Sequence, residues 1–302
     1  MDSQPPKRLL GKNCGPHAIS FRPRVGYICG MTTTSHVLAA GPDWRFADII
    51  CKAGPQDRSF EEQHRLVSIS PVTRGTFQYR TRRGSSVLVP GSILLGTPGA
   101  CYECGHEHAA GDRCLSFQCT PEFFDTVAGG VAGARSTAFA ASSLPPLPQL
   151  MPLLAEAELA RDMPDPGAFE ELAVRLAGAV IAMLSQAAPR SRQPTPDDER
   201  RVTAAVRHIE QHAEAPLSLR KLARDAGLSP YHFLRTFRQV AGMTPHQYVL
   251  RTRLHRAAVR LRRSGEAISG IAYDAGFNDL STFNRRFRRL MGVSPGVYRA
   301  AG

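Results

Sequence analysis

The feature that most constrains this 302-residue chain is a repeat in its last third. The segment Leu222–Gly227 recurs 49 residues later as Ile271–Gly276. After a one-residue insertion, the apolar and arginine positions of Phe233–Tyr248 recur 50 residues later in Phe283–Tyr298. A fixed offset with matching apolar positions indicates one supersecondary unit that is used twice.

Each copy is predicted to fold as a helix, a tight turn and a second helix. In the first copy, Leu219–Ala226 carries its apolar residues on one helical face, and Gly227 suits a left-handed helix end. Ser229 and Pro230 are typical of the start of the next helix. The matching helix of the second copy is expected from about Leu280 to Leu290, with Asn278 or Asp279 as its cap.

One long helix, Pro245–Arg263, is expected between the two copies. At 1.5 Å per residue it would be about 28 Å long. That length approaches the ~34 Å between successive major-groove faces on one side of a DNA duplex. Two helix-turn-helix units held by such a rod are suited to reading two consecutive grooves.

The same region carries nearly all of the excess positive charge. Residues 197–302 contain 19 Lys+Arg and 9 Asp+Glu, whereas residues 1–196 contain 19 and 17. A basic segment of this size indicates a polyanionic partner, and the repeat makes double-stranded DNA the leading one. Charge alone also fits a membrane-surface module or a helical bundle with a basic solvated face.

The chain from about Val202 to Ala300 resembles the C-terminal DNA-binding domain of the AraC/XylS family of bacterial transcription regulators. The resemblance is carried by Gly276-Phe277, Phe283, Arg285-Arg286-Phe287, Gly292-Val293-Ser294-Pro295 and Tyr298-Arg299. It implies an all-α domain of seven helices, whose third and sixth helices enter adjacent major grooves of promoter DNA. It also implies transcription regulation, usually activation, and RNA polymerase as a partner of an activator.

The resemblance assigns DNA contacts to particular positions. The residues expected to face bases are Tyr231, Leu234 and Arg235 in the first copy and Ser281, Asn284 and Arg285 in the second. Arginine is the best base reader of these, because its fork matches the O6 and N7 atoms of guanine. Phosphate contacts are expected from Arg238, Arg286, Arg288 and Arg289. A solvated or ion-paired role is the alternative for each arginine.

The N-terminal half is predicted to consist of short strands. Candidate strands are Arg45–Cys51, Leu66–Val72, Thr76–Arg80, Val87–Val89 and Ile93–Leu95. Short strands between Gly and Pro turns indicate a small β-barrel or sandwich. Through Gly75, Pro90-Gly91, Pro98-Gly99 and Leu115-Ser116-Phe117, the region resembles the cupin-like domain that precedes the DNA-binding half in many family members. That resemblance implies a sensor of a small-molecule or metal effector.

One cluster in this half combines cysteine and histidine. Thiolates and imidazoles suit tetrahedral Zn²⁺ or another thiophilic ion, so a metal site is a candidate here. A metal-free effector pocket and a thiol-redox sensor are the alternatives, and Cys51 shows no pattern of its own. The candidate ligands are Cys101, Cys104, His106, His108 and Cys114, with Asp112 close by in the sequence.

These patterns predict an α+β protein of five segments. An irregular extension (1–35), in which Met31 is an alternative start, precedes the cupin-like effector-sensing domain (36–143). A helical connector (144–188) and a linker (189–198) lead to the AraC-type DNA-binding domain (199–302). The connector carries two amphipathic helices, which are expected either to form a homodimer or to pack on the chain's own β domain.

Composition excludes several other classes of protein. The chain is 42% hydrophobic and has no low-complexity segment, which fits an ordinary folded protein. Its longest apolar run, Leu176–Leu184, is about half of a membrane span. Basic residues interrupt the N-terminus, so we expect no secretory signal, a cytoplasmic location, no membrane partner and reduced cysteines.

Other functions are also compatible with a DNA-binding tail. A cupin-type metalloenzyme, a thiol-redox sensor or a repair protein with a Cys–Zn methyl acceptor could each be fused to a DNA-binding tail. A purely architectural DNA-binding protein is a further alternative. The sequence shows no dedicated catalytic domain, so we expect a regulator rather than an enzyme.

Overall fold

The computed structural model describes residues 33–59, 61–106, 110–131, 134, 139–162, 165–185 and 194–300. Three parts of the expectations lie outside the described residues. They are residues 1–32 of the extension, the candidate ligand His108 and residues 189–193 of the linker. None of the described helices combines the length and hydropathy that a membrane span requires.

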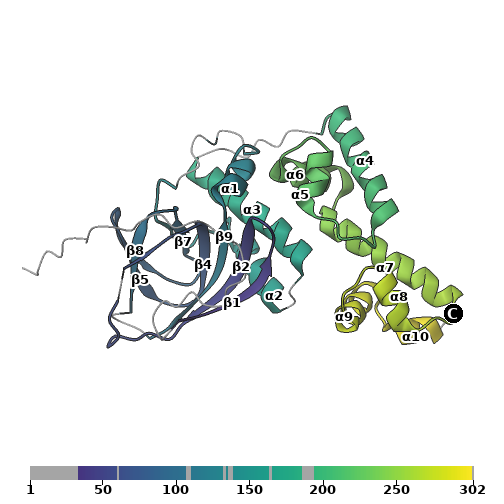
Figure 1. The fold of residues 1–302 in the computed structure, drawn as a ribbon, viewed down its shortest axis with the longest axis horizontal. Helices are drawn as coiled ribbons and strands as arrows, with labels where there is room; N and C mark the ends of the chain where they lie inside the picture. Colours follow the sequence, from purple (N-terminus) through teal and green to yellow (C-terminus); the bar gives the residue numbers. More distant parts are fainter. Residues whose placement is uncertain are drawn as a thin grey trace, which may run out of the picture.

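The N-terminal half consists of two antiparallel sheets (Figure 1). In the larger sheet the order is β1 (Thr33–Ala40), β2 (Trp44–Cys51), β9 (Asp112–Cys119), β4 (Val67–Gly75), β7 (Ile93–Gly96) and β10 (Ser143–Leu144). In the smaller sheet the order is β3 (Glu61–Gln63), β8 (Cys101–Gly105), β5 (Phe77–Thr81) and β6 (Gly84–Leu88).

Alternation along β9 explains how the two layers and the helices pack. Cys114 packs with residues of both sheets, whereas its neighbours Leu115 and Phe117 belong to the core shared with the helices. Successive side chains of a strand point to opposite faces, so β9 is buried on both sides. Phe46 lies opposite Phe117 in the register and 5.0 Å from the ring of Phe169, which joins the sheet to the helical connector.

Three helices cover one face of the larger sheet. They are α1 (Pro121–Ala128), α2 (Met151–Asp162) and α3 (Pro166–Leu184). Asp165 caps α3 by accepting hydrogen bonds from the backbone of Gly167 and Ala168. Figure 1 shows α3 between the larger sheet and the C-terminal helices, and α3 contacts α5, α6 and α7 as well as β1.

In the C-terminal part, residues 194–300 form helices joined by turns and short loops, with no strand. Its helices are α4 (Pro196–His212), α5 (Leu219–Asp225), α6 (Pro230–Ala241), α7 (Pro245–Arg263), α8 (Ile268–Asp274), α9 (Leu280–Met291) and α10 (Pro295–Ala300). Helix α7 has the bounds that the sequence predicts and separates α4–α6 from α8–α10 (Figure 1). Gly227 has a φ of 66° at the first turn and Gly276 has a φ of 87° at the second, which favours glycine at both.

Two expected boundaries differ from the structure. Strand β1 begins at Thr33, so the irregular extension ends before residue 35, because Thr33 and Thr34 pair with Cys51 and Ile50. Helix α4 begins at Pro196 rather than after the linker. Thr195 and Asp198 form a reciprocal capping box there, so the helix starts within the expected linker.

Candidate DNA interface

Two corresponding helices, α6 and α9, hold the residues expected to face bases. Phe233 and Phe237 of α6, and Phe283 and Phe287 of α9, are fully buried. Residues four apart lie on one helical face, so each Phe pair fixes which side of its helix faces inward. The opposite sides therefore carry the candidate base readers.

The reading side of α9 is open to solvent. Ser281, Asn284 and Arg285 are all exposed, as are the phosphate candidates Arg288 and Arg289. Arg286 is different, because its guanidinium pairs with the Asp165 carboxylate at 2.7 Å. In this arrangement Arg286 connects α9 to the N-terminus of α3 instead of facing outward.

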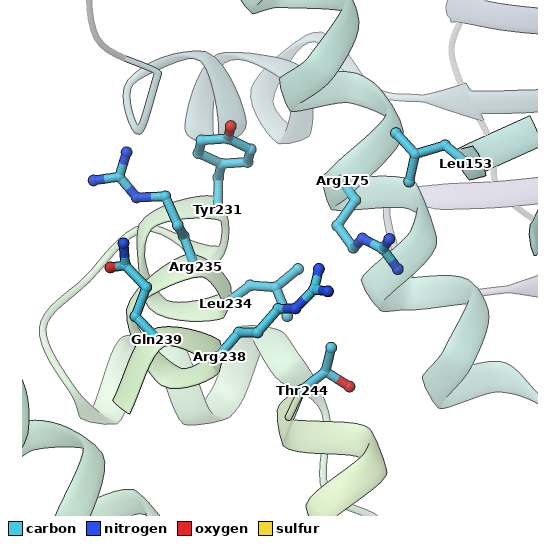
Figure 2. A pocket seen from close by; sticks show the side chains of 8 residues that line it. All are labelled: Leu153, Arg175, Tyr231, Leu234, Arg235, Arg238, Gln239 and Thr244. Carbon is cyan, nitrogen blue, oxygen red and sulfur yellow. The ribbon is translucent and has the colours of Figure 1, made fainter. Parts of the chain in front are cut away.

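The reading side of α6 is covered. Leu234 is only 3% exposed, and Tyr231 and Arg235 are half-buried. A cavity of about 480 Å³ lies between α6 and the N-terminal half, with Leu153 and Arg175 on its far side (Figure 2). From the C-terminal part it is lined by Tyr231, Leu234, Arg235, Arg238, Gln239 and Thr244. Tyr231 and Leu234, two of the residues expected to face DNA, thus lie beside the connector helices, whereas the guanidinium of Arg235 points away from Arg175 and Leu153 (Figure 2).

Glycines on the N-terminal side allow this close approach. A Cβ atom added to Gly178, in the middle of α3, would lie 2.0 Å from a ring carbon of Tyr231. A Cβ on Gly167 would lie 2.3 Å from the imidazole of His246, and one on Gly130 would lie 2.4 Å from the hydroxyl of Ser229. All three distances are shorter than any real Cβ contact, so larger residues could not occupy these positions without a shift.

Carboxylates of α3 bind the amino ends of two C-terminal helices. Glu170 accepts hydrogen bonds from the backbone N–H groups of Leu219 and Arg220, and Glu171 accepts one from His246. The first N–H groups of a helix have no partner within it, so these carboxylates satisfy donors at α5 and α7. Burial raises the pKa of both glutamates despite these bonds.

Asp165 provides a second connection between the two halves. One carboxylate oxygen lies 2.9 Å from Nε2 of His246, and the other pairs with Arg286. Burial alone would raise the pKa of Asp165, but the hydrogen bond and charge of His246 and the charge of Arg286 outweigh it. They hold that pKa well below its usual range. Arg220 also forms an ion pair with Asp43 at the start of β2.

Within the C-terminal part, Arg253 holds the two helix-turn-helix units together. It donates to the carbonyl of Ala215 at 2.9 Å and to the carbonyl of Gly276 at 2.8 Å. The first carbonyl follows α4 and the second lies in the turn after α8. This side chain therefore fixes the relative placement of the two units.

The expected cysteine and histidine cluster is only partly assembled. Among the described residues, ligand atoms of Cys51, His106 and Asp112 lie within 4.8 Å of one another. Cys101 lies at the other end of β8, opposite Gln63, and is outside this group. Cys104 and Cys114 pack in the core between the sheets, where burial raises the pKa of Cys114 well above its usual value. Of the four expected ligands that the structure describes, only His106 belongs to the group.

Comparison with known proteins agrees with the helix-turn-helix geometry. A family model described as a helix-turn-helix domain matches residues 222–301. The probable transcriptional regulator LumQ of Photobacterium leiognathi is 39% identical over 92 residues, which are 30% of this chain and 37% of LumQ. The MmsAB operon regulatory protein of Pseudomonas aeruginosa is 32% identical over 30% of each chain. The chain thus matches only about a third of these two relatives.

A shorter relative is matched over most of its length. The regulatory protein SoxS of Salmonella typhimurium is 35% identical over 98 residues, which are 32% of this chain and 92% of SoxS. A solved regulator from Chromobacterium violaceum, described by its AraC-type DNA-binding domain, is 30% identical. The match covers 35% of this chain and 95% of that one, with a TM-score of 0.33. The relatives are named as regulators and not as enzymes. Because nearly all of SoxS is matched, this chain belongs to the AraC family of transcription regulators.

Proposed function

We propose that this chain is a DNA-binding transcription regulator whose N-terminal half controls when α6 can read DNA. Helices α6 and α9 would enter consecutive major grooves of promoter DNA, with Arg235 and Arg285 as the main base readers. The two-sheet half would act as a cupin-like sensor of a small-molecule or metal effector. We further propose activation, with RNA polymerase as a partner, and a homodimer formed through α2, where Met151 and Leu159 are exposed.

The observation that carries this proposal is the difference between the two reading helices. The reading positions of α9 are exposed, whereas Tyr231 of α6 packs against Gly178 of α3 and Leu234 is buried beside the cavity between α6 and α3. A protein in this arrangement can offer only one of its two reading helices to a duplex. Full binding would require α6 to separate from α3.

An effector would act by favouring the separated arrangement. A ligand that binds both arrangements equally well shifts nothing, however tightly it binds. Contacts of α3 with α5, α6 and α7 give the sheets a direct mechanical connection to the reading helix. An effector that moves α3 by a small amount would therefore disturb Glu170, Glu171 and Gly178 together.

Gly178→Ala tests this control directly. The added methyl group would displace the Tyr231 ring, at a cost of about 1–3 kcal/mol to the covered arrangement. Alanine is also a better helix former than glycine by about 1 kcal/mol, so α3 itself should be stabilised. We expect the full-length variant to bind a duplex selected from a random pool about 5–100-fold more tightly than the unaltered chain does.

Gly270→Ala is the matched control, because a Cβ at that helical position meets nothing within 4 Å. It should leave the affinity for DNA unchanged. If the Gly178 and Gly270 variants bind DNA with equal affinity, the packing of α6 against α3 does not limit DNA binding.

A further inference from the structure

Three side chains with metal-ligand chemistry meet at one end of the β sandwich. Cys51 is the last residue of β2, and Asp112 is the first residue of β9 and pairs with Cys51 in the antiparallel register. His106 directly follows β8 of the smaller sheet. Their ligand atoms all lie within 4.8 Å of one another, although the residues come from both sheets.

The group is largely buried and its side chains are hydrogen-bonded, unlike a chance cluster of exposed polar residues. His106 is 7% exposed and Asp112 is 9% exposed, and Nε2 of His106 lies 2.6 Å from Oδ2 of Asp112. The Cys114 thiol donates to the other carboxylate oxygen, Oδ1, at 3.5 Å, which orients the carboxylate from behind. Cys51 is half-buried, so an ion could reach the group from its side.

We propose that Cys51, His106 and Asp112 bind one Zn²⁺ ion. Zinc takes cysteine sulfur, histidine nitrogen and carboxylate oxygen in tetrahedral sites, with a water or a further ligand in the fourth position. Binding releases the proton of the Cys51 thiol to solvent. The thiolate and the Asp112 carboxylate then balance the two positive charges of the ion, which suits a site that is largely removed from water.

The bound ion would fasten the end of β2 to β9 and to the segment after β8. A zinc site supplies folding free energy because the unfolded chain does not hold its ligands together. The ion would therefore hold the strands together at this end of the sandwich. This assignment goes beyond the proposed control of α6, because it stands on the ligand geometry alone.

The test uses the full-length protein purified with zinc and then dialysed against metal-free buffer. We expect about one zinc per chain by mass spectrometry. Replacement of zinc by Co²⁺ should give the charge-transfer absorption of a single thiolate ligand. Cys51→Ser should lose this absorption and weaken metal binding by more than about tenfold.

Cys101→Ser is the matched control, since Cys101 lies at the opposite end of β8. It should keep both the stoichiometry and the Co²⁺ absorption. The proposal is overturned if the unaltered protein holds no metal, if Cys51→Ser keeps the thiolate absorption, or if Cys101→Ser loses it. Circular dichroism of the metal-free proteins separates loss of the site from loss of the fold, and Asp112→Asn provides a second variant of the site.

Discussion

The carboxylate of Glu170, on α3, accepts a hydrogen bond of 2.9 Å from the backbone N–H of Leu219, the first residue of α5. A residue of the N-terminal half thus completes the hydrogen bonding of a helix in the DNA-binding half. Ser218 caps the same helix from within by accepting from Lys221. If the halves separate as proposed, helix α5 keeps its Ser218 cap and loses the contact with Glu170.

Glu170→Gln should weaken this contact. The two carboxylate oxygens accept from Leu219 and Arg220, and an amide would place an NH₂ group against one of these two donors. A buried donor without a partner costs about 1–3 kcal/mol. We expect faster hydrogen exchange in α5 and α6 and tighter binding of the full chain to duplex DNA.

Glu61→Gln controls for the change in charge, because Glu61 is exposed on β3. Removing its charge should leave hydrogen exchange in α5 and α6 as it is. If both glutamine variants bind DNA equally, the gain comes from net charge and not from the lost contact.

Arg285→Ala should relax sequence preference. Arg285 is exposed on the reading side of α9, where its fork could bind a guanine. Loss of one such contact should reduce discrimination at one base step by about 1–3 kcal/mol. Selection from a random duplex pool, followed by affinity measurements on single-base variants, would measure this.

Arg289→Ala gives the comparison for a phosphate contact. It should weaken binding to all sequences alike and lower the salt dependence. Equal weakening on every duplex by Arg285→Ala would make Arg285 a phosphate contact as well.

Much of the C-terminal fold could be predicted because its signals are local. The bounds of α7 follow from Thr244 and Pro245 at one end and from Ser264 at the other. Asp279, one of two candidate caps, is the residue that accepts from Thr282 at the start of α9. Caps and apolar periodicity act within a few residues, so a single sequence contains them.

The contacts between segments could not be predicted in the same way. Glu170 and Leu219 are far apart in the sequence, and so are Cys51 and Asp112, so only the folded chain brings each pair together. One signal was available at Leu234, an apolar residue at a position expected to read bases. The burial of Leu234 beside α3 explains why an apolar residue occupies this position.

Arg253→Ala should disturb the two reading helices without removing a base contact. Its guanidinium binds carbonyls of both helix-turn-helix units, at Ala215 and Gly276. Without it, the carbonyls of Ala213, Ala215 and Gly276 lose a donor, and the spacing between α6 and α9 becomes less fixed. We expect weaker binding to a site that spans two grooves and nearly unchanged binding to a half-site, measured by fluorescence anisotropy on both duplexes. A proportional loss on both duplexes would argue against a role in spacing.

His64 should make the stability of the β sandwich depend on pH. Its Nε2 lies 2.8 Å from the hydroxyl of Tyr79 and its ring stacks on Tyr102, and burial lowers the pKa of His64 from 6.5 to about 4. Between pH 7 and pH 5 the unfolded chain therefore gains a proton here that the folded chain does not. Stability must fall as the pH falls, and this group contributes about 2 kcal/mol of the loss.

Substitution of His64 isolates this contribution. Urea unfolding of His64→Gln should show a slope with pH that is shallower by that amount, since glutamine can still contact Tyr79 but does not titrate. His36→Gln, at an exposed position on β1, should keep the original slope. An unchanged slope in His64→Gln would mean that His64 takes up its proton equally in the folded and unfolded chains, and so has access to water in the fold.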